Sequence, residues 1–279
     1  MNTLLNAGRG VPSAPLLTEE QLNTQFRQTM RLPANEAGEL RLRGELQTLM
    51  EELLCRDLKQ DTRAQSMLLG CRLRLRLLQN MIAAERKEDN FISLHCDLRT
   101  WLADLCAAAD MLLHPLGCPV VFDALEQRIE AACAPREIAL LLLELICNGI
   151  RHGEWPATGE QPATGEKIHV AMTLNRAKKH NRPATCTIAV TSPGALDLQR
   201  LHISGQRAGS GAAAMQHTAY LHAGSMIWLN RNGHTIASLR LPLRPYAGLP
   251  LAETPDFTEL LSDQLSPVYT ALSPVALMG

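Results

Sequence analysis

Apolar residues recur every three or four positions through the first third of the chain. The positions are Leu42, Leu46, Leu49 and Leu53 in one series, and Leu68, Cys71, Leu75, Leu78 and Ile82 in the next. This spacing places apolar side chains on one face of a helix. We therefore predict two long helices, one over about 20–58 and one over about 62–88, joined by a short connection.

A pair of helices on its own buries its apolar seam poorly, because each helix covers only one side of the other. We therefore expect residues 20–90 to form a helical hairpin that pairs with the hairpin of a second chain, giving a homodimer. Residues 1–19 show no such periodicity and are expected to be disordered.

After residue 90 the pattern changes to shorter helices and strands. Asp97 is a suitable N-cap for an amphipathic helix that ends near residue 114, and Pro135 and Gly153 bound a second helix. A third follows the glycines near residue 210. Alternating or short apolar runs predict strands at 118–124, 128–133, 167–174, 185–192, 225–230 and 234–243. Asn232 and Gly233 are typical of a hairpin turn between the last two strands.

These elements predict an α+β protein. A long dimerising helical hairpin over 20–90 is followed by an α/β sandwich domain over 97–243. The proline-rich C-terminal tail, residues 244–279, is expected to be a loose arm.

Composition excludes several kinds of partner. The net charge is −1 and the pI is about 6.8, so we expect no nucleic-acid binding. The longest apolar run, residues 138–146, is broken by Glu144 and is far shorter than the roughly 20 residues that span a bilayer, so no membrane insertion is expected. Without an apolar N-terminal segment we expect no signal peptide and a cytoplasmic location.

Eight cysteines are scattered along the chain with no C-x-x-C pair and no zinc-ligand spacing. In a chain of this length without an export signal, a disulfide framework is not expected. We interpret the cysteines as reduced side chains that act as small hydrophobic residues.

The stretch LLLELICNGIRHG, residues 141–153, places Glu144 and Asn148 four residues apart and therefore on one face of a helix. A helical hairpin, then a small sandwich whose central helix carries Glu-x-x-x-Asn, then a glycine turn before another helix, resembles a sensor histidine kinase. In that family a dimerisation hairpin precedes a Bergerat-fold ATPase domain of the type also found in HSP90. The resemblance covers about residues 20–243.

The resemblance assigns roles to the predicted central helix. Glu144 and Asn148 match the family's asparagine box, and the resemblance implies that both hold Mg²⁺, which prefers oxygen ligands. Arg151 and His152 stand where the family contacts the nucleotide phosphates.

The other nucleotide motifs are altered. Aligning Gly194 with the first glycine of the family's Asp-x-Gly-x-Gly box puts Ser192 at the position of the adenine-reading aspartate. A hydroxyl lacks the charge that roughly doubles the strength of such a hydrogen bond. The later glycine box keeps Gly209 and Gly211, where backbone N–H groups approach phosphate at a helix N-terminus. The resemblance therefore implies weak binding of ATP with Mg²⁺.

The phosphoacceptor is missing. The segment around Pro33 resembles the family's phosphoacceptor box, but Gln28 stands at the histidine position, and the first histidine of the chain is His95. Glutamine has no basic nitrogen and forms no phosphoramidate. We therefore expect a degenerate, histidine-kinase-like protein without autophosphorylation.

Three functions follow from the resemblance. The first is a two-component-type regulator or scaffold with weak or lost kinase activity, whose partner is a response regulator or another signalling protein. The alternative is an active nucleotide-dependent kinase acting on another protein, as anti-sigma-factor kinases do. A histidine-phosphotransfer protein would need a histidine in the hairpin, which the sequence lacks.

Overall fold

The computed structural model describes residues 36–56, 58, 61–88, 91–155, 166–176, 184–197 and 211–276. The chain divides into two compact units, one ending at Cys71 and one beginning at Arg72. The boundary falls inside helix α3 (Thr62–Glu85), which continues unbroken from the first unit into the second.

The first unit contains α2 (Glu36–Leu54) and the beginning of α3. α3 begins after Asp61, whose carboxylate accepts a hydrogen bond from the Ala64 N–H at 2.8 Å and so caps the helix. Both predicted helices are present, although the expected start of the first, near residue 20, lies outside the described residues. The apolar seam positions, such as Leu46 and Leu53, are fully buried within one chain and need no second copy for their burial.

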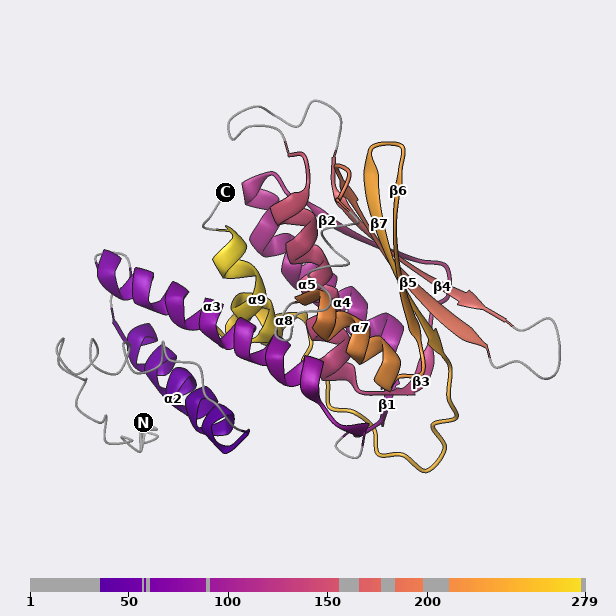
Figure 1. The fold of residues 1–279 in the computed structure, drawn as a ribbon, viewed down its shortest axis with the longest axis horizontal. Helices are drawn as coiled ribbons and strands as arrows, with labels where there is room; N and C mark the ends of the chain where they lie inside the picture. The colour runs from indigo at the N-terminus through magenta and orange to yellow at the C-terminus, as the bar shows by residue number, and fades with distance from the viewer. Residues whose placement is uncertain are drawn as a thin grey trace, which may run out of the picture. The chain divides into compact units, whose positions relative to one another are not determined.

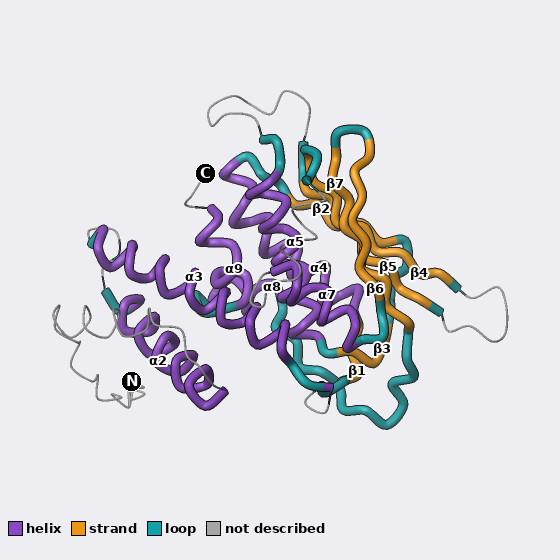
Figure 2. Tube along the Cα trace, in the orientation of Figure 1, coloured by secondary structure: helices purple, strands orange, loops and turns teal. Residues whose placement is uncertain are grey.

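The second unit is a two-layer α+β sandwich. Beyond α3 its elements are β1 (Leu94–Asp97), α4 (Leu98–Leu113), η2 (His114–Leu116), β2 (Val120–Ala124), β3 (Glu130–Cys133), α5 (Pro135–His152), β4 (Ile168–Asn175), β5 (Thr185–Pro193), α7 (Gly211–Leu221), β6 (Ser225–Arg231), β7 (His234–Pro242), α8 (Phe257–Ser262) and α9 (Pro267–Ala276). A five-stranded sheet has the order β2-β4-β5-β7-β6, with β2 parallel to β4 and the other neighbours antiparallel. Helices α4, α5 and α7 lie on one face of this sheet (Figures 1 and 2).

The element boundaries follow from local signals that the sequence carries. The Asp97 carboxylate accepts from the backbone N–H groups of Arg99 and Thr100, and α4 begins there as predicted. In the β6–β7 turn, Asn232 and Gly233 have φ angles of 51° and 76°, as a hairpin turn of this kind requires. The antiparallel β1–β3 pair was not predicted in full, because β1 is only four residues long and too short to show alternation.

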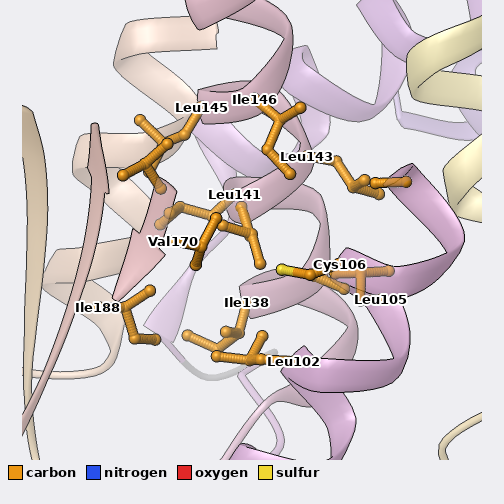
Figure 3. Close-up of a cluster of buried hydrophobic side chains, with 14 of the residues drawn as sticks. Leu102, Leu105, Cys106, Ile138, Leu141, Leu143, Leu145, Ile146, Val170 and Ile188 are labelled. Carbon is orange, nitrogen blue, oxygen red and sulfur yellow. The ribbon is translucent and has the colours of Figure 1, made fainter. Parts of the chain in front are cut away.

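The hydrophobic core of the second unit lies between the sheet and the helices (Figure 3). Leu102 of α4, Ile138 of α5 and Val170 of β4 meet there and are fully buried. Aliphatic side chains dominate because only 4% of the chain is aromatic. The buried Trp101 of α4 donates its indole N–H to the Pro135 carbonyl at 3.1 Å, which joins α4 to the start of α5.

The apolar run at 138–146 forms the buried part of α5 rather than a membrane segment. Ile138, Leu142 and Ile146 are all less than 2% exposed. Among the described residues, no helix combines the length and the apolar character needed to cross a bilayer.

All eight cysteines are free, and all but Cys55 are buried. Burial raises the pKa of the Cys71, Cys147 and Cys186 thiols to about 12, so these groups stay protonated near neutral pH. The prediction that the cysteines act as small hydrophobic residues is confirmed for the buried ones.

The expectation of a loose arm after residue 244 is wrong. Helices α8 and α9 pack against α4 and α5, and Leu260, Val268 and Leu272 are fully buried in the core. The prolines in this segment favoured a loop, but Pro267 is the first residue of α9, where its missing N–H costs no helical hydrogen bond. The C-terminal segment is therefore part of the second unit.

Beyond Cys71, α3 is bound to the rest of the second unit by arginines. Arg72 donates to the Ser273 hydroxyl at 3.1 Å and to the Gln264 carbonyl at 3.0 Å. Further along the helix, Arg86 forms an ion pair with Glu137 in the first turn of α5. These contacts attach α3 to both α5 and the C-terminal segment.

Candidate functional site

A cavity of about 450 Å³ lies along the C-terminal half of α5, beside the end of β5, the start of α7 and the β6–β7 hairpin. Six residues that the sequence predicted for the site line it: Glu144, Asn148, Arg151, His152, Ser192 and Gly211. Gly194 lies next to the cavity without lining it, and Gly209 and Gln28 lie outside the described residues. Residues distant in sequence are thus brought together as the motifs implied.

Helix α5 contributes the polar wall. Its apolar face packs into the core, which turns Glu144, Asn148 and the last helical turn towards the cavity. Glu144 is buried, Asn148 is half-buried, and Arg151 and His152 reach the surface. Partial burial and the neighbouring Arg151 charge lower the pKa of His152, so this side chain is neutral at pH 7. The permanent positive charge on this wall is therefore Arg151.

Ser192 forms part of the floor at the end of β5. It is 7% exposed and lies against Gly149 of α5. A Cβ atom on Gly149 would stand 2.9 Å from the Ser192 Cβ, closer than such atoms approach. Gly149 thus allows β5 to approach α5 closely enough to bring Ser192 into the cavity.

Gly194 has a structural role in the turn after β5. Its φ is +86°, a conformation that side chains with a Cβ rarely adopt, and a Cβ would also stand 2.8 Å from the Glu154 backbone nitrogen. Its N–H donates to the Gly233 carbonyl at 2.8 Å. Gly194 therefore sets the path of residues 195–197, which line the cavity.

Among the lining residues that the sequence analysis did not identify are Asp197, Trp228 and Thr235. The Thr235 hydroxyl accepts from the Leu196 N–H at 2.9 Å and donates to the Gly194 carbonyl at 2.9 Å, which ties the loop to β7. A lone threonine in an alternating strand gives no signal of such a role. Asp197 supplies a carboxylate on the cavity wall, and only its position in the folded loop reveals this.

A buried ion pair fixes Glu144, one of the polar residues that α5 contributes to the cavity. Arg76 of α3 donates from Nε to Glu144 Oε2 at 2.8 Å, and the side chains are 8% and 9% exposed. Burial alone would lower the pKa of Arg76, but the neighbouring Cys147 and Glu144 outweigh it, so the net shift is upward and the guanidinium is charged. This pair could not be predicted from the sequence, because its members are 68 residues apart.

Mg²⁺ was expected on Glu144 and Asn148, and Glu144 does not fit that role. One of its oxygens is bound by the Arg76 guanidinium and the other packs against Gly211. Within the ranges that the structure describes, no three His, Cys, Asp or Glu side chains are grouped so that they could hold a metal ion. Asn148 remains as an oxygen ligand on this face of α5, where Mg²⁺ usually takes one or two protein oxygens besides those of phosphates and water.

Gly211→Ala is expected to destabilise the protein by about 1–3 kcal/mol, because it overpacks a filled space. The new Cβ would overlap Glu144 Oε1 and stand 2.7 Å from its Cδ. Glu144 cannot move aside without leaving Arg76. Urea unfolding measures the change.

Gly44→Ala is the matched control, since a Cβ there meets nothing within 4 Å. Replacing a glycine inside a helix should stabilise α2 by roughly 0.5–1 kcal/mol. Equal effects of the two substitutions would contradict the close packing of Gly211 on Glu144.

His222, at the end of α7, fastens that helix to the start of α5. Its Nε2 accepts a hydrogen bond from the Ala134 N–H at 3.1 Å, and its Nδ1 lies 2.8 Å from the Thr218 carbonyl. These partners require a neutral ring with the proton on Nδ1, and burial lowers the pKa of His222 in agreement. Helix α7, whose first residue lines the cavity, is thereby fixed at its far end.

No family model matches the sequence, and no curated protein matches it. Solved structures do match. Full-length ShkA in complex with AMPPNP gives a TM-score of 0.53 at 14% identity, covering 86% of this chain and 48% of that one. Histidine kinase AdeS of Acinetobacter baumannii gives 0.45 at 12% identity, covering 81% of this chain and 97% of that one. The cytoplasmic segment of histidine kinase QseC gives 0.39 at 18%, covering 61% and 92%.

Of these three matches, the one to ShkA has a TM-score above 0.5. At 14% identity it is evidence for the fold alone. The helices and strands predicted between residues 97 and 243 are present in the predicted order, and the chain has a histidine-kinase-like fold.

Proposed function

We propose that this protein is a two-component-type signalling regulator of the cytoplasm that binds a nucleotide weakly and does not phosphorylate itself on histidine. One observation carries the proposal. Residues from α5, β5 and α7, expected from their motifs to form a nucleotide site, line one cavity of about 450 Å³. That volume lies within the range of about 300–1,000 Å³ that is usual for small-molecule sites.

The phosphate end of the proposed site lies between α5 and the start of α7. Arg151 offers a permanent positive charge, Asn148 an amide, and Gly211 the first backbone turn of α7. The N-terminal N–H groups of a helix attract anions, and the start of α7 lies at the cavity. We expect this end to supply most of the affinity.

The base end lacks the usual carboxylate. Ser192 offers a neutral hydroxyl where the resembled family has an aspartate. Losing a hydrogen bond to a charged group costs about 1.5–3 kcal/mol, or roughly ten- to a hundredfold in affinity. We therefore expect submillimolar binding with little selectivity for the base.

No histidine is placed to accept a phosphoryl group in the hairpin. The first histidine of the chain, His95, is in β1, where its Nε2 lies 3.1 Å from Glu130 Oε1 and its ring stacks on Tyr246. This supports a regulator or scaffold that acts through another signalling protein, such as a response regulator.

Calorimetric titration with ATP tests the proposed site. We expect weak saturable binding to the wild type and at least a roughly tenfold loss in Asn148→Ala, since a hydrogen bond to a charged phosphate is worth about 1.5–3 kcal/mol. Asn175→Ala is the matched control, because Asn175 bonds to Thr187 on the sheet and does not line the cavity. Equal affinity of all three proteins would show that ATP binds elsewhere.

Incubation with γ-labelled ATP separates the two functions that the resemblance leaves open. A regulator is expected to acquire no acid-labile label. Label that is acid-stable and appears on an added protein would instead establish the alternative, a kinase acting on another protein.

We also propose a homodimer through residues 20–90, with a different seam from the one first expected. Leu75 and Leu78 are 3% and 0% exposed within one chain, whereas Leu73 is half-buried and Leu77 is 36% exposed on the same helix. Leu73→Glu with Leu77→Glu should therefore give a folded monomer, because unpaired charges in an interface are costly. A wild type that sediments as a monomer at micromolar concentration would count against the proposal.

A further inference from the structure

Glu144 of the cavity wall is bound by Arg76 of α3, a residue that does not itself line the cavity. Glu144 lines the cavity, and its Oε2 accepts the Arg76 Nε–H at 2.8 Å in surroundings that leave both side chains less than a tenth exposed. The carboxylate that the resemblance assigned to a metal ion is thus already neutralised by a cation of the chain itself.

We propose that Arg76 takes the place of a divalent cation at Glu144, so that the cavity binds the phosphates of a metal-free nucleotide. This rests on the proposed nucleotide site and adds that its ligand is the free nucleotide rather than its magnesium complex.

The charge of Arg76 disfavours a metal ion at Glu144. The guanidinium is permanently protonated and bound to Glu144, so a metal ion at that carboxylate would have to displace it or stand beside a like charge. Arg151, which lines the cavity, contributes a positive charge that attracts a polyphosphate and repels Mg²⁺. The pair of Arg76 with Glu144 has no net charge, so Glu144 offers a metal ion no free negative charge.

Arg76 also has a hydrogen-bond donor that is not satisfied. Within the part of the chain that the structure describes, Arg76 Nη2 is buried and has no hydrogen-bond partner. This orphaned group is a donor, and only an acceptor atom, such as an oxygen, can satisfy it. A metal ion brings no acceptor of its own. The unsatisfied Nη2 donor of Arg76 therefore calls for an oxygen atom rather than for a cation.

Calorimetric titration with ATP in EDTA and in excess Mg²⁺ tests the proposal. For the wild type we expect the two affinities to agree within about twofold, which is far less than the tenfold that each 1.4 kcal/mol would produce. In Arg76→Gln, Glu144 is released, and affinity in Mg²⁺ should exceed affinity in EDTA by about tenfold or more. Arg76→Lys keeps the positive charge and should keep the wild-type behaviour.

Two further variants serve as controls for the effect of Arg76→Gln. Arg76→Gln with Glu144→Gln leaves no unpaired charge and no carboxylate for a metal, so it should fold and show no preference for Mg²⁺. Arg74→Gln, an arginine change on the same helix, should behave as wild type.

The outcomes separate the two proposals. A wild type that binds ATP only with Mg²⁺ overturns this inference and leaves the nucleotide site standing. An Arg76→Gln variant that stays indifferent to Mg²⁺ also overturns it. Absence of binding in every protein and both buffers removes the proposed nucleotide function, and the inference with it.

Discussion

Replacing Arg76 with methionine is expected to lower the free energy of unfolding by about 3–5 kcal/mol, the usual effect of removing one partner from a buried ion pair. Glu144 would be left as a carboxylate that is less than a tenth exposed and has lost its counter-charge. Urea unfolding, followed by circular dichroism, measures the loss.

The double variant, Arg76→Met with Glu144→Met, separates charge from packing. Replacing both members of a buried pair by apolar side chains is often neutral or stabilising, so most of the loss should be recovered. Arg41→Met is the matched control, because its pair with Glu45 is exposed and such pairs are worth about 0.5 kcal/mol. A double variant no more stable than Arg76→Met would show that the arginine matters for its packing and not for its charge.

Replacing Leu272 with alanine is expected to cost about 2–5 kcal/mol, as for other fully buried leucines. Its side chain lies in the core that α9 shares with α4 and α5. The same change at Leu251, which is 69% exposed, should alter stability by less than about 0.5 kcal/mol. Thermal unfolding of the two variants gives the comparison.

The contrast between these leucines tests whether the C-terminal segment is part of the domain. If Leu272→Ala unfolds at the wild-type temperature, α9 does not contribute to the core in solution. A joint loss of helical and near-ultraviolet signals at a lower temperature would show that the segment unfolds together with the sandwich.

Much of the fold could be predicted because its signals are local. The cap at Asp97, Pro135 at the first turn of α5, and the Asn232-Gly233 turn each act within a few residues, and the structure places elements there as predicted. The burial of α9 could not be predicted in this way. It depends on an apolar surface that α4 and α5 present only after folding, while Pro267 suggests a loop when viewed alone.

The candidate site likewise contains residues that could be predicted from the sequence and residues that could not. Glu144 and Asn148 could be found from their spacing, since a helix places such residues on one face. Arg76 could not, because nothing in a leucine-rich helix distinguishes one of its arginines from the next until the helix lies beside α5. Ser192, expected at the site from its position in an altered motif, lines the cavity, whereas the carboxylate of Asp197 became evident only from the path of its loop.

Two ion pairs connect α3 with α5: Arg76 with Glu144, and Arg86 with Glu137. The arginine that comes later in α3 pairs with the glutamate that comes earlier in α5, so the two helices run in opposite directions. Both pairs lie on the part of α3 that belongs to the second unit. Because Glu144 also lines the cavity, a ligand that displaced its carboxylate would act on α3 through Arg76, while the pair of Arg86 with Glu137 would limit how far α3 shifts along α5. Linked equilibria are reciprocal, so a shift of α3 along α5 would in turn change the cavity wall.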